Sequence, residues 1–142
     1  MRELGFFVPS NRCTNKGNLR GLDGFNEIIA ANRTGYRVGA KQERENLHHV
    51  MTFARAAMIS LKFEPIETKA QVDITLIEPN ERRDVSNVIA ASKYILDALT
   101  RPRGKKPGVG LIVDDSPKWC EVNVSVQVKQ GKAGAYITVR EG

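Results

Sequence analysis

The chain has little cysteine, few aromatic residues and no long apolar run. Its two cysteines, Cys13 and Cys120, lie far apart and form no metal-ligand motif, which favours a reduced, cytoplasmic protein. No stretch approaches the roughly 18 apolar residues that span a membrane. The first five residues also lack the apolar core of a signal peptide. We therefore expect a protein without a membrane segment.

An excess of basic residues is the clearest compositional feature. The formal charge is +6 over 142 residues, a length that suits one domain, and such a charge favours polyanionic partners. Six basic side chains flank two acidic clusters, and we expect them to contact the phosphates of such a partner: Arg82, Arg83, Arg101, Arg103, Lys105 and Lys106. The alternative is that Arg82 and Arg83 form an exposed polar rim and that 101–106 is a solvated loop.

Periodicity predicts a mixture of strands and helices. Apolar residues recur at spacings of three and four in 41–61, and they alternate in 71–78 and 121–129. The expected strands are 2–9, 71–78, 109–113, 121–129 and 135–140, and the expected helices are 25–32, 41–61 and 85–99, with a loop at 11–24. We expect the last two strands to form a β-hairpin around the glycines of 131–134. The predicted fold is a single α+β domain over 1–142, a mixed sheet with a C-terminal hairpin packed against helices.

Two acidic positions could converge if their elements pack side by side. Asp84 precedes the helix of 85–99, and Asp114 and Asp115 follow the apolar run of 109–113. Gathered carboxylates suit Mg²⁺, which takes oxygen ligands and keeps several waters. The alternatives are structural: Asp84 is well placed to cap the helix, and the aspartate pair could end a strand in a turn.

The motifs around these acids resemble those of the RusA-type Holliday-junction resolvases. The matching residues are Arg83-Asp84-x-x-Asn87, Lys93-Tyr94-Ile95-Leu96-Asp97-Ala98-Leu99, and Asp114-Asp115 with Lys118-Trp119. A further match, Gly24-Phe25-Asn26-Glu27 and the residues that follow to Arg33, is similar to the variants carried by phages and prophages.

The resemblance implies a Mg²⁺-dependent endonuclease that resolves four-way DNA junctions, with Mn²⁺ as a possible substitute. It implies Asp84, Asp115 and the residue at 86 as catalytic acids and metal ligands, with Asp114 in support. It also implies a homodimer, because two strands of a junction are cut symmetrically. Lys118 lies within the match and is a further expected DNA contact. If a phage encodes the chain, its place is the cytoplasm of the bacterial host.

One departure from the family pattern concerns the site directly. The pattern is Asp-x-Asp-Asn, whereas this chain has Ser86 where the second aspartate stands. A hydroxyl binds a metal weakly and brings no charge. Either water or a neighbour such as Asn87 fills the gap, or activity is weakened. The alternative function is therefore a branched-DNA-binding protein that cuts poorly or not at all. A third hypothesis, intermediate between these two, is a less specific nuclease that acts on flaps or other branched DNA.

The resemblance also implies Lys93 as the catalytic cation, because the family has a lysine within this helix. Lys93 follows position 86 by seven residues, close to two helical turns, so both positions face the same way. A lysine there could meet a phosphate or stabilise charge in the transition state. The alternative is a surface pair between Lys93 and Asp97 at i, i+4.

Overall fold

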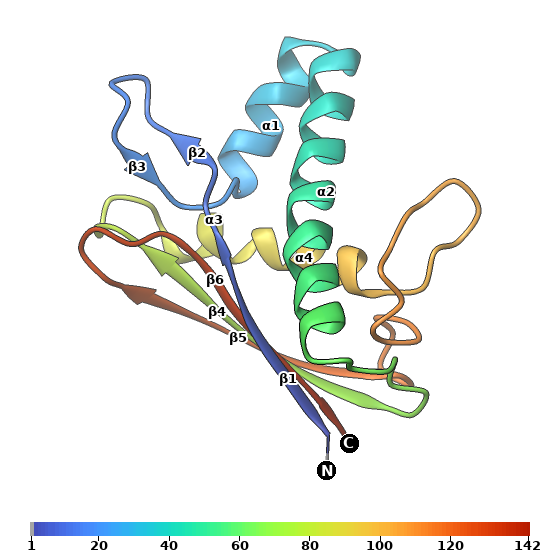
Figure 1. The fold of residues 1–142 in the computed structure, drawn as a ribbon. Coiled ribbons are helices and arrows are strands. Elements are labelled where there is room, and N and C mark those ends of the chain that lie inside the picture. Colours follow the sequence, from blue (N-terminus) through green and yellow to red (C-terminus); the bar gives the residue numbers. More distant parts are fainter. Residues whose placement is uncertain (1) are drawn as a thin grey trace.

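A four-stranded mixed sheet with helices on one face forms the framework of the protein (Figure 1). The computed structural model describes residues 2–142. The strands lie in the order β1 (Glu3–Pro9), β6 (Gly134–Glu141), β4 (Ala70–Glu78) and β5 (Cys120–Val128). β6 is antiparallel to both neighbours, whereas β4 and β5 are parallel. The predicted α+β class and the mixed sheet are therefore confirmed.

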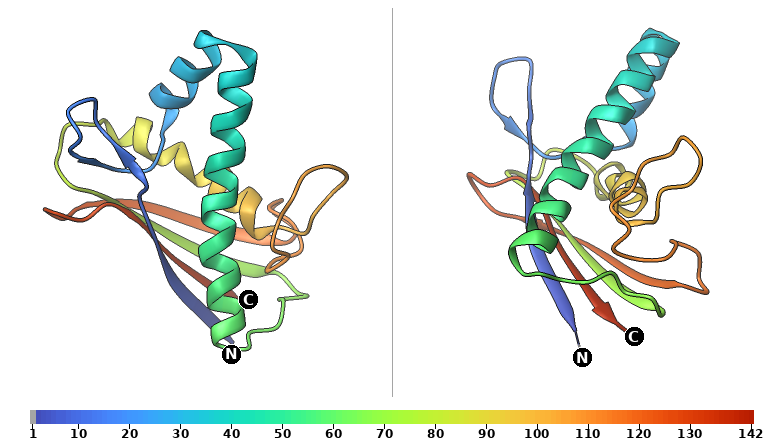
Figure 2. Two further views of the ribbon diagram at one scale, coloured as in Figure 1. Left: turned by 45° about the horizontal axis from the view of Figure 1, so that its top comes forward. Right: turned by 45° about the vertical axis from the view of Figure 1, so that its right-hand side comes forward.

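The helices pack on the same side of this sheet, and the opposite side is free of helices in both figures (Figures 1 and 2). They are α1 (Phe25–Thr34), α2 (Tyr36–Ser60), α3 (Val85–Ile89) and α4 (Ala91–Leu99). Among residues 2–142, none of these helices is long and apolar enough to cross a bilayer. Helix α2 begins five residues before the predicted start, directly after Gly35, which separates it from α1.

The core lies between the helices and the sheet, and strand alternation determines which residues enter it. On β4, Val72, Ile74 and Leu76 are buried, whereas Asp73 and Thr75 between them are partly exposed. This period of two places one row of side chains against the helices and the other against solvent. The predicted strand and its orientation are thus correct.

The predicted C-terminal hairpin is wrong. β5 and β6 are both present, but they do not pair with each other, because β4 lies between them. β5 is an edge strand with alternating exposed residues, whereas β4 is buried through most of its length. The more apolar strand takes the central position, since a central strand is covered by neighbours on both edges.

The predicted strand at 109–113 is also wrong. This segment follows the C-terminus of α4, and its backbone satisfies the free carbonyls of that helix instead of joining the sheet. Val109 donates to Ala98 (2.9 Å) and Ile112 donates to Leu99 (3.1 Å). Leu111 and Ile112 are fully buried, which explains why the run is apolar.

The predicted helix of 85–99 forms as two helices. Ala90 ends α3 and precedes α4 while keeping helical backbone angles, so the chain direction changes little. Asp84 occupies the N-cap position of α3, as predicted, but its side chain forms no capping hydrogen bond.

Two irregular segments project from the fold beside α2. The predicted loop of 11–24 contains a short hairpin of β2 (Arg12–Cys13) and β3 (Leu19–Arg20). The loop of 101–110 lies on the opposite side of α2 from this hairpin in every view (Figures 1 and 2). The two loops therefore border different surfaces of the molecule.

Candidate functional site

A small charged pocket lies where α4, the loop of 101–110 and the aspartate pair meet. Its cavity volume is about 80 Å³. Its lining includes six of the residues that the sequence singled out: Lys93, Arg101, Arg103, Lys106, Asp114 and Asp115. Asp97 and Thr100 complete the lining. Acidic side chains from two segments thus share a pocket with a basic rim, but the first segment contributes Asp97 and not the predicted Asp84.

Lys93 connects the two acidic segments. Its Nζ lies 3.0 Å from Oδ1 of Asp97 and 3.5 Å from Oδ2 of Asp115. The hydrogen bond to Asp97 is the main reason that the pKa of Lys93 lies above the ordinary lysine value. Partial burial lowers this pKa by less than the hydrogen bond raises it, and the charges of both aspartates raise it further. Lys93 therefore stays protonated at neutral pH beside two carboxylates.

Asp97 is the site residue that sequence reasoning did not assign. It contacts Lys93 and also Nζ of Lys106, 3.0 Å from its Oδ1. Its side chain is only 15% exposed, so these contacts are partly shielded from water. The signal available in the sequence was its position four residues after Lys93, on the same helix face.

The aspartate pair is held by its own turn and by the loop. Backbone and side-chain hydrogen bonds from Asp115 and Ser116 lower the pKa of Asp114, with a smaller contribution from Arg103, whose Nη2 lies 3.7 Å away. Asp114 is therefore ionised well below neutral pH. A nearby thiol is affected as well: burial, and then the charges of Asp115 and Asp114, raise the pKa of Cys120 to about 11.

The basic loop is shaped by its backbone. Arg103 and Lys106 exchange two backbone hydrogen bonds of 2.9 Å across Gly104, which has a φ of 57°. Glycine is favoured there because a side chain would strain that left-handed conformation. Arg101 is anchored by an ion pair with Glu67. Of the loop cations, Arg103 is thus the one that contacts the aspartate pair.

Asp84 does not reach this pocket. It precedes Lys93 by nine residues, which corresponds to about 13 Å along the two helices. Asp84 and Ser86 are both exposed. Within one protomer, Asp84 therefore does not join the aspartate pair in the pocket, although we expected it to.

Asn87 and Asn26 contact each other and hold two helices together, and neither lines the charged pocket. Oδ1 of the buried Asn87 accepts a hydrogen bond from the backbone N–H of Asn26, at 2.7 Å, and so ties α3 to the first turn of α1. Gly24 allows this approach, because an added Cβ would lie 2.2 Å from the Asn87 carbonyl oxygen.

Arg83 belongs to a buried ion-pair network. Its guanidinium contacts Glu78 (2.8 Å) and Glu27 (2.6 Å) and donates to the carbonyl of Leu22 (2.7 Å). We expected Arg83 to contact a phosphate, but its side chain is only 14% exposed and is not available for that contact. The residue instead links the strand β4 to α1.

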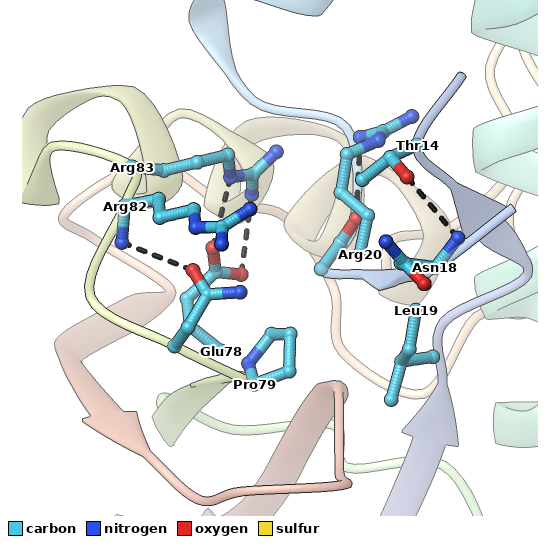
Figure 3. A pocket seen from close by; sticks show the side chains of 10 residues that line it. Thr14, Asn18, Leu19, Arg20, Glu78, Pro79, Arg82 and Arg83 are labelled. Carbon is cyan, nitrogen blue, oxygen red and sulfur yellow. Dashed lines mark hydrogen bonds and ion pairs between the residues drawn. The ribbon is translucent and has the colours of Figure 1, made fainter. Parts of the chain in front are cut away.

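Arg82 remains exposed beside a second pocket, of about 310 Å³, at the β2–β3 hairpin (Figure 3). Its backbone N–H donates to Oδ1 of Asn80 at 3.0 Å. Arg20 also lines this pocket, but it is paired with the buried Asp23 at 2.9 Å. Of the two predicted arginines, Arg82 is thus the one whose position suits an external anion.

The two remaining basic residues lie outside the charged pocket. Lys105 lines a larger groove between the loop and α2. Lys118 is exposed, with its Nζ 5.2 Å from the centre of the Trp119 ring, a cation–π arrangement.

The predicted Mg²⁺ ligand set does not fit one protomer. Within residues 2–142, no three His, Cys, Asp or Glu side chains are placed to hold a metal ion together. Asp84 is remote, and the carboxylates of Asp97 and Asp115 are already contacted by the Lys93 ammonium group. The pocket therefore presents cations next to carboxylates.

Comparison with known proteins does not assign the chain to a group. No model of a protein family matches it, and no curated protein matches it.

Proposed function

We propose that this protein is a RusA-type endonuclease that binds four-way DNA junctions and cuts them by hydrolysing phosphodiester bonds. The observation that carries the proposal is the Lys93 contact with Asp97 and Asp115, inside a pocket rimmed by Arg101, Arg103 and Lys106. A protonated lysine next to carboxylates can stabilise the negative charge that develops on a phosphate oxygen. The basic rim can hold the flanking phosphates.

The resemblance adds the substrate and the partner to this proposal. It implies branched DNA, a Mg²⁺ requirement that Mn²⁺ could replace, a RusA-like fold and a homodimer whose two sites cut symmetrically. Cytoplasmic location follows from the same resemblance and from the reduced cysteines.

A second candidate is a protein that binds branched DNA without cutting it. Two observations favour it: Ser86 replaces a family aspartate, and Asp84 lies away from the aspartate pair. The basic rim serves both candidates, so charge does not distinguish them.

One assay separates the candidates. Labelled four-way junctions are incubated, with and without Mg²⁺ or Mn²⁺, with wild type, Asp115→Asn, Ser86→Asp and the control Glu121→Gln, an exposed acid on β5. Nicks that need both the metal and Asp115 support the endonuclease. Junction binding without nicks, with cutting gained in Ser86→Asp, supports the binding protein. Equal affinity for junction and linear duplex contradicts both.

A further inference from the structure

A groove adjoins the charged pocket and runs along α2. Its volume is about 760 Å³, and it lies between one face of α2 and the loop of 101–110. Tyr36, Arg44 and His48 line it from the helix, and Lys105 lines it from the loop. Figures 1 and 2 show the loop standing to one side of α2.

The groove and the charged pocket are adjacent. Asp97 and Lys106 line both of them, and their ion pair of 3.0 Å lies where the two meet. A ligand of this groove therefore lies beside the pocket of the proposed endonuclease.

The shape of the groove suits one nucleic-acid strand. From Tyr36 to His48 the helix rises about 18 Å, enough for about five phosphates at the spacing of a stacked strand. The helix side of the groove is therefore long enough to follow a short segment of one strand.

The groove carries an aromatic platform. Tyr36 is 89% exposed, although it lies at the start of a helix whose other face packs in the core. An exposed ring in a basic groove is the arrangement on which bases of single strands stack, because every base has a π-face. Tyr36 is also the first residue of α2, so it lines the groove at the start of that helix.

The groove also has cations that are free to meet phosphates. Among residues 2–142, Arg44 and Lys105 take part in no ion pair, whereas Lys106 is paired with Asp97. Glu43, on the adjacent position of α2, is the acidic side chain that would repel a strand placed too close to the helix.

We propose that this groove binds a single-stranded segment of DNA, with a base stacked on Tyr36 and phosphates at Arg44 and Lys105, and leads it to Asp97 and Asp115. The inference rests on the proposed function, and it specifies the substrate: branched DNA that has an unpaired arm, such as a flap or an opened junction strand.

Binding by fluorescence anisotropy tests the groove. The probes are a single-stranded oligonucleotide, a duplex with a single-stranded flap, and a blunt duplex of equal length. Tyr36→Ala should weaken binding of the first two by about 5- to 160-fold, the range for one lost base–aromatic stack, and Tyr36→Phe should retain it. Blunt-duplex binding should change by less than about twofold.

A matched pair tests the phosphate contacts. Arg44→Ala should weaken flap binding and reduce the slope of log affinity against log salt by about one. Arg55→Ala, an exposed arginine on the same helix and outside the groove lining, should leave both unchanged. A 2-aminopurine base in the single strand should lose fluorescence on binding to wild type and not to Tyr36→Ala.

The outcomes separate this inference from the proposed function. If Asp115-dependent junction cutting is found but Tyr36→Ala binds the flap as well as wild type does, the groove assignment alone is overturned. If Tyr36-dependent single-strand binding is found but junctions are neither bound nor cut, the groove stands and the junction endonuclease falls. If wild type binds neither these probes nor the four-way junction, both are overturned.

Discussion

Arg82 and Arg83 are neighbours in the sequence but occupy different environments. Arg83 is enclosed by Glu78, Glu27 and a backbone carbonyl, whereas Arg82 is exposed beside the pocket of Figure 3. A pattern of two adjacent arginines does not show this difference, because it depends on where Glu27 is brought by the fold. Only Arg82 is free to meet an external anion.

We predict opposite phenotypes for the two arginines. Arg83→Ala should lower the free energy of unfolding by about 3–5 kcal/mol, because it leaves the buried Glu78 carboxylate without its cation. Arg82→Ala should change the free energy of unfolding by less than about 0.5 kcal/mol, and it should weaken the proposed DNA binding. Urea denaturation and anisotropy measure the two effects. Equal loss of stability in both variants would contradict the assignment of Arg83 to the interior network.

Lys93 should titrate above the ordinary lysine value of 10.5. Its pKa is raised chiefly by the hydrogen bond to Asp97, so its contribution to stability is fully present below the unfolded-state pKa and is lost as pH rises through the folded-state value. NMR of ¹³C-dimethylated lysines should find one resonance that titrates late and is absent in Lys93→Arg. Asp97→Asn should shift that resonance to lower pH, and no shift would show that the contact does not form in solution.

At the level of elements, the segment of 108–112 decides where the basic loop stands. It is fastened to the C-terminus of α4 by backbone hydrogen bonds, and Gly108 lies against the chain there. A Cβ on Gly108 would be 2.0 Å from the Thr100 carbonyl oxygen. The position of Arg101 to Lys106 over the pocket therefore depends on a close backbone contact.

Gly108→Ala should damage both stability and DNA binding. The clash with a backbone oxygen cannot be relieved by a side-chain rotation, and we expect a loss of about 1–3 kcal/mol together with weaker junction binding as the loop is displaced. Gly5→Ala is the control, since the nearest atom to its Cβ is Oγ1 of Thr138 at 3.9 Å. Thermal unfolding and anisotropy provide the measurements. An unaltered Tm would mean that the segment is not packed as described.

At the level of the whole molecule, the charge of +6 and the basic rim predict that the proposed DNA binding depends on salt. The log–log slope should be about −0.9 for each phosphate that is neutralised. Replacing both Arg101 and Arg103 by alanine should make the slope less steep by about two, whereas Arg55→Ala should leave it unchanged. Equal slopes for wild type and the double variant would place the DNA on another surface.

The proposed homodimer has a mass test. Sedimentation equilibrium should give twice the 15.8 kDa of one chain, with or without a junction. A dimer is needed for paired cuts in two strands, because one protomer carries one charged pocket of this kind among residues 2–142. A mass of one chain at every concentration, combined with one chain bound per junction, would contradict symmetric cleavage.

The sequence by itself determined the local elements. Alternation in Ala70–Glu78 and Cys120–Val128, and the three-and-four spacing of Leu47, Val50, Met51 and Ala54, follow from which face each residue turns to the core. These patterns are properties of short stretches, so they can be read without knowing the neighbours. The charge pattern likewise predicted that the basic loop and the aspartate pair would share a pocket.

Tertiary structure alone decided which elements became neighbours. It placed β4 between β5 and β6, turned the apolar run of 109–113 onto the end of α4, enclosed Arg83 among acids and kept Asp84 out of the pocket of Asp115. The physical reason is that strand pairing and ion pairing join residues remote in the chain, and their free energy depends on the burial that the whole fold creates. No local periodicity contains that information.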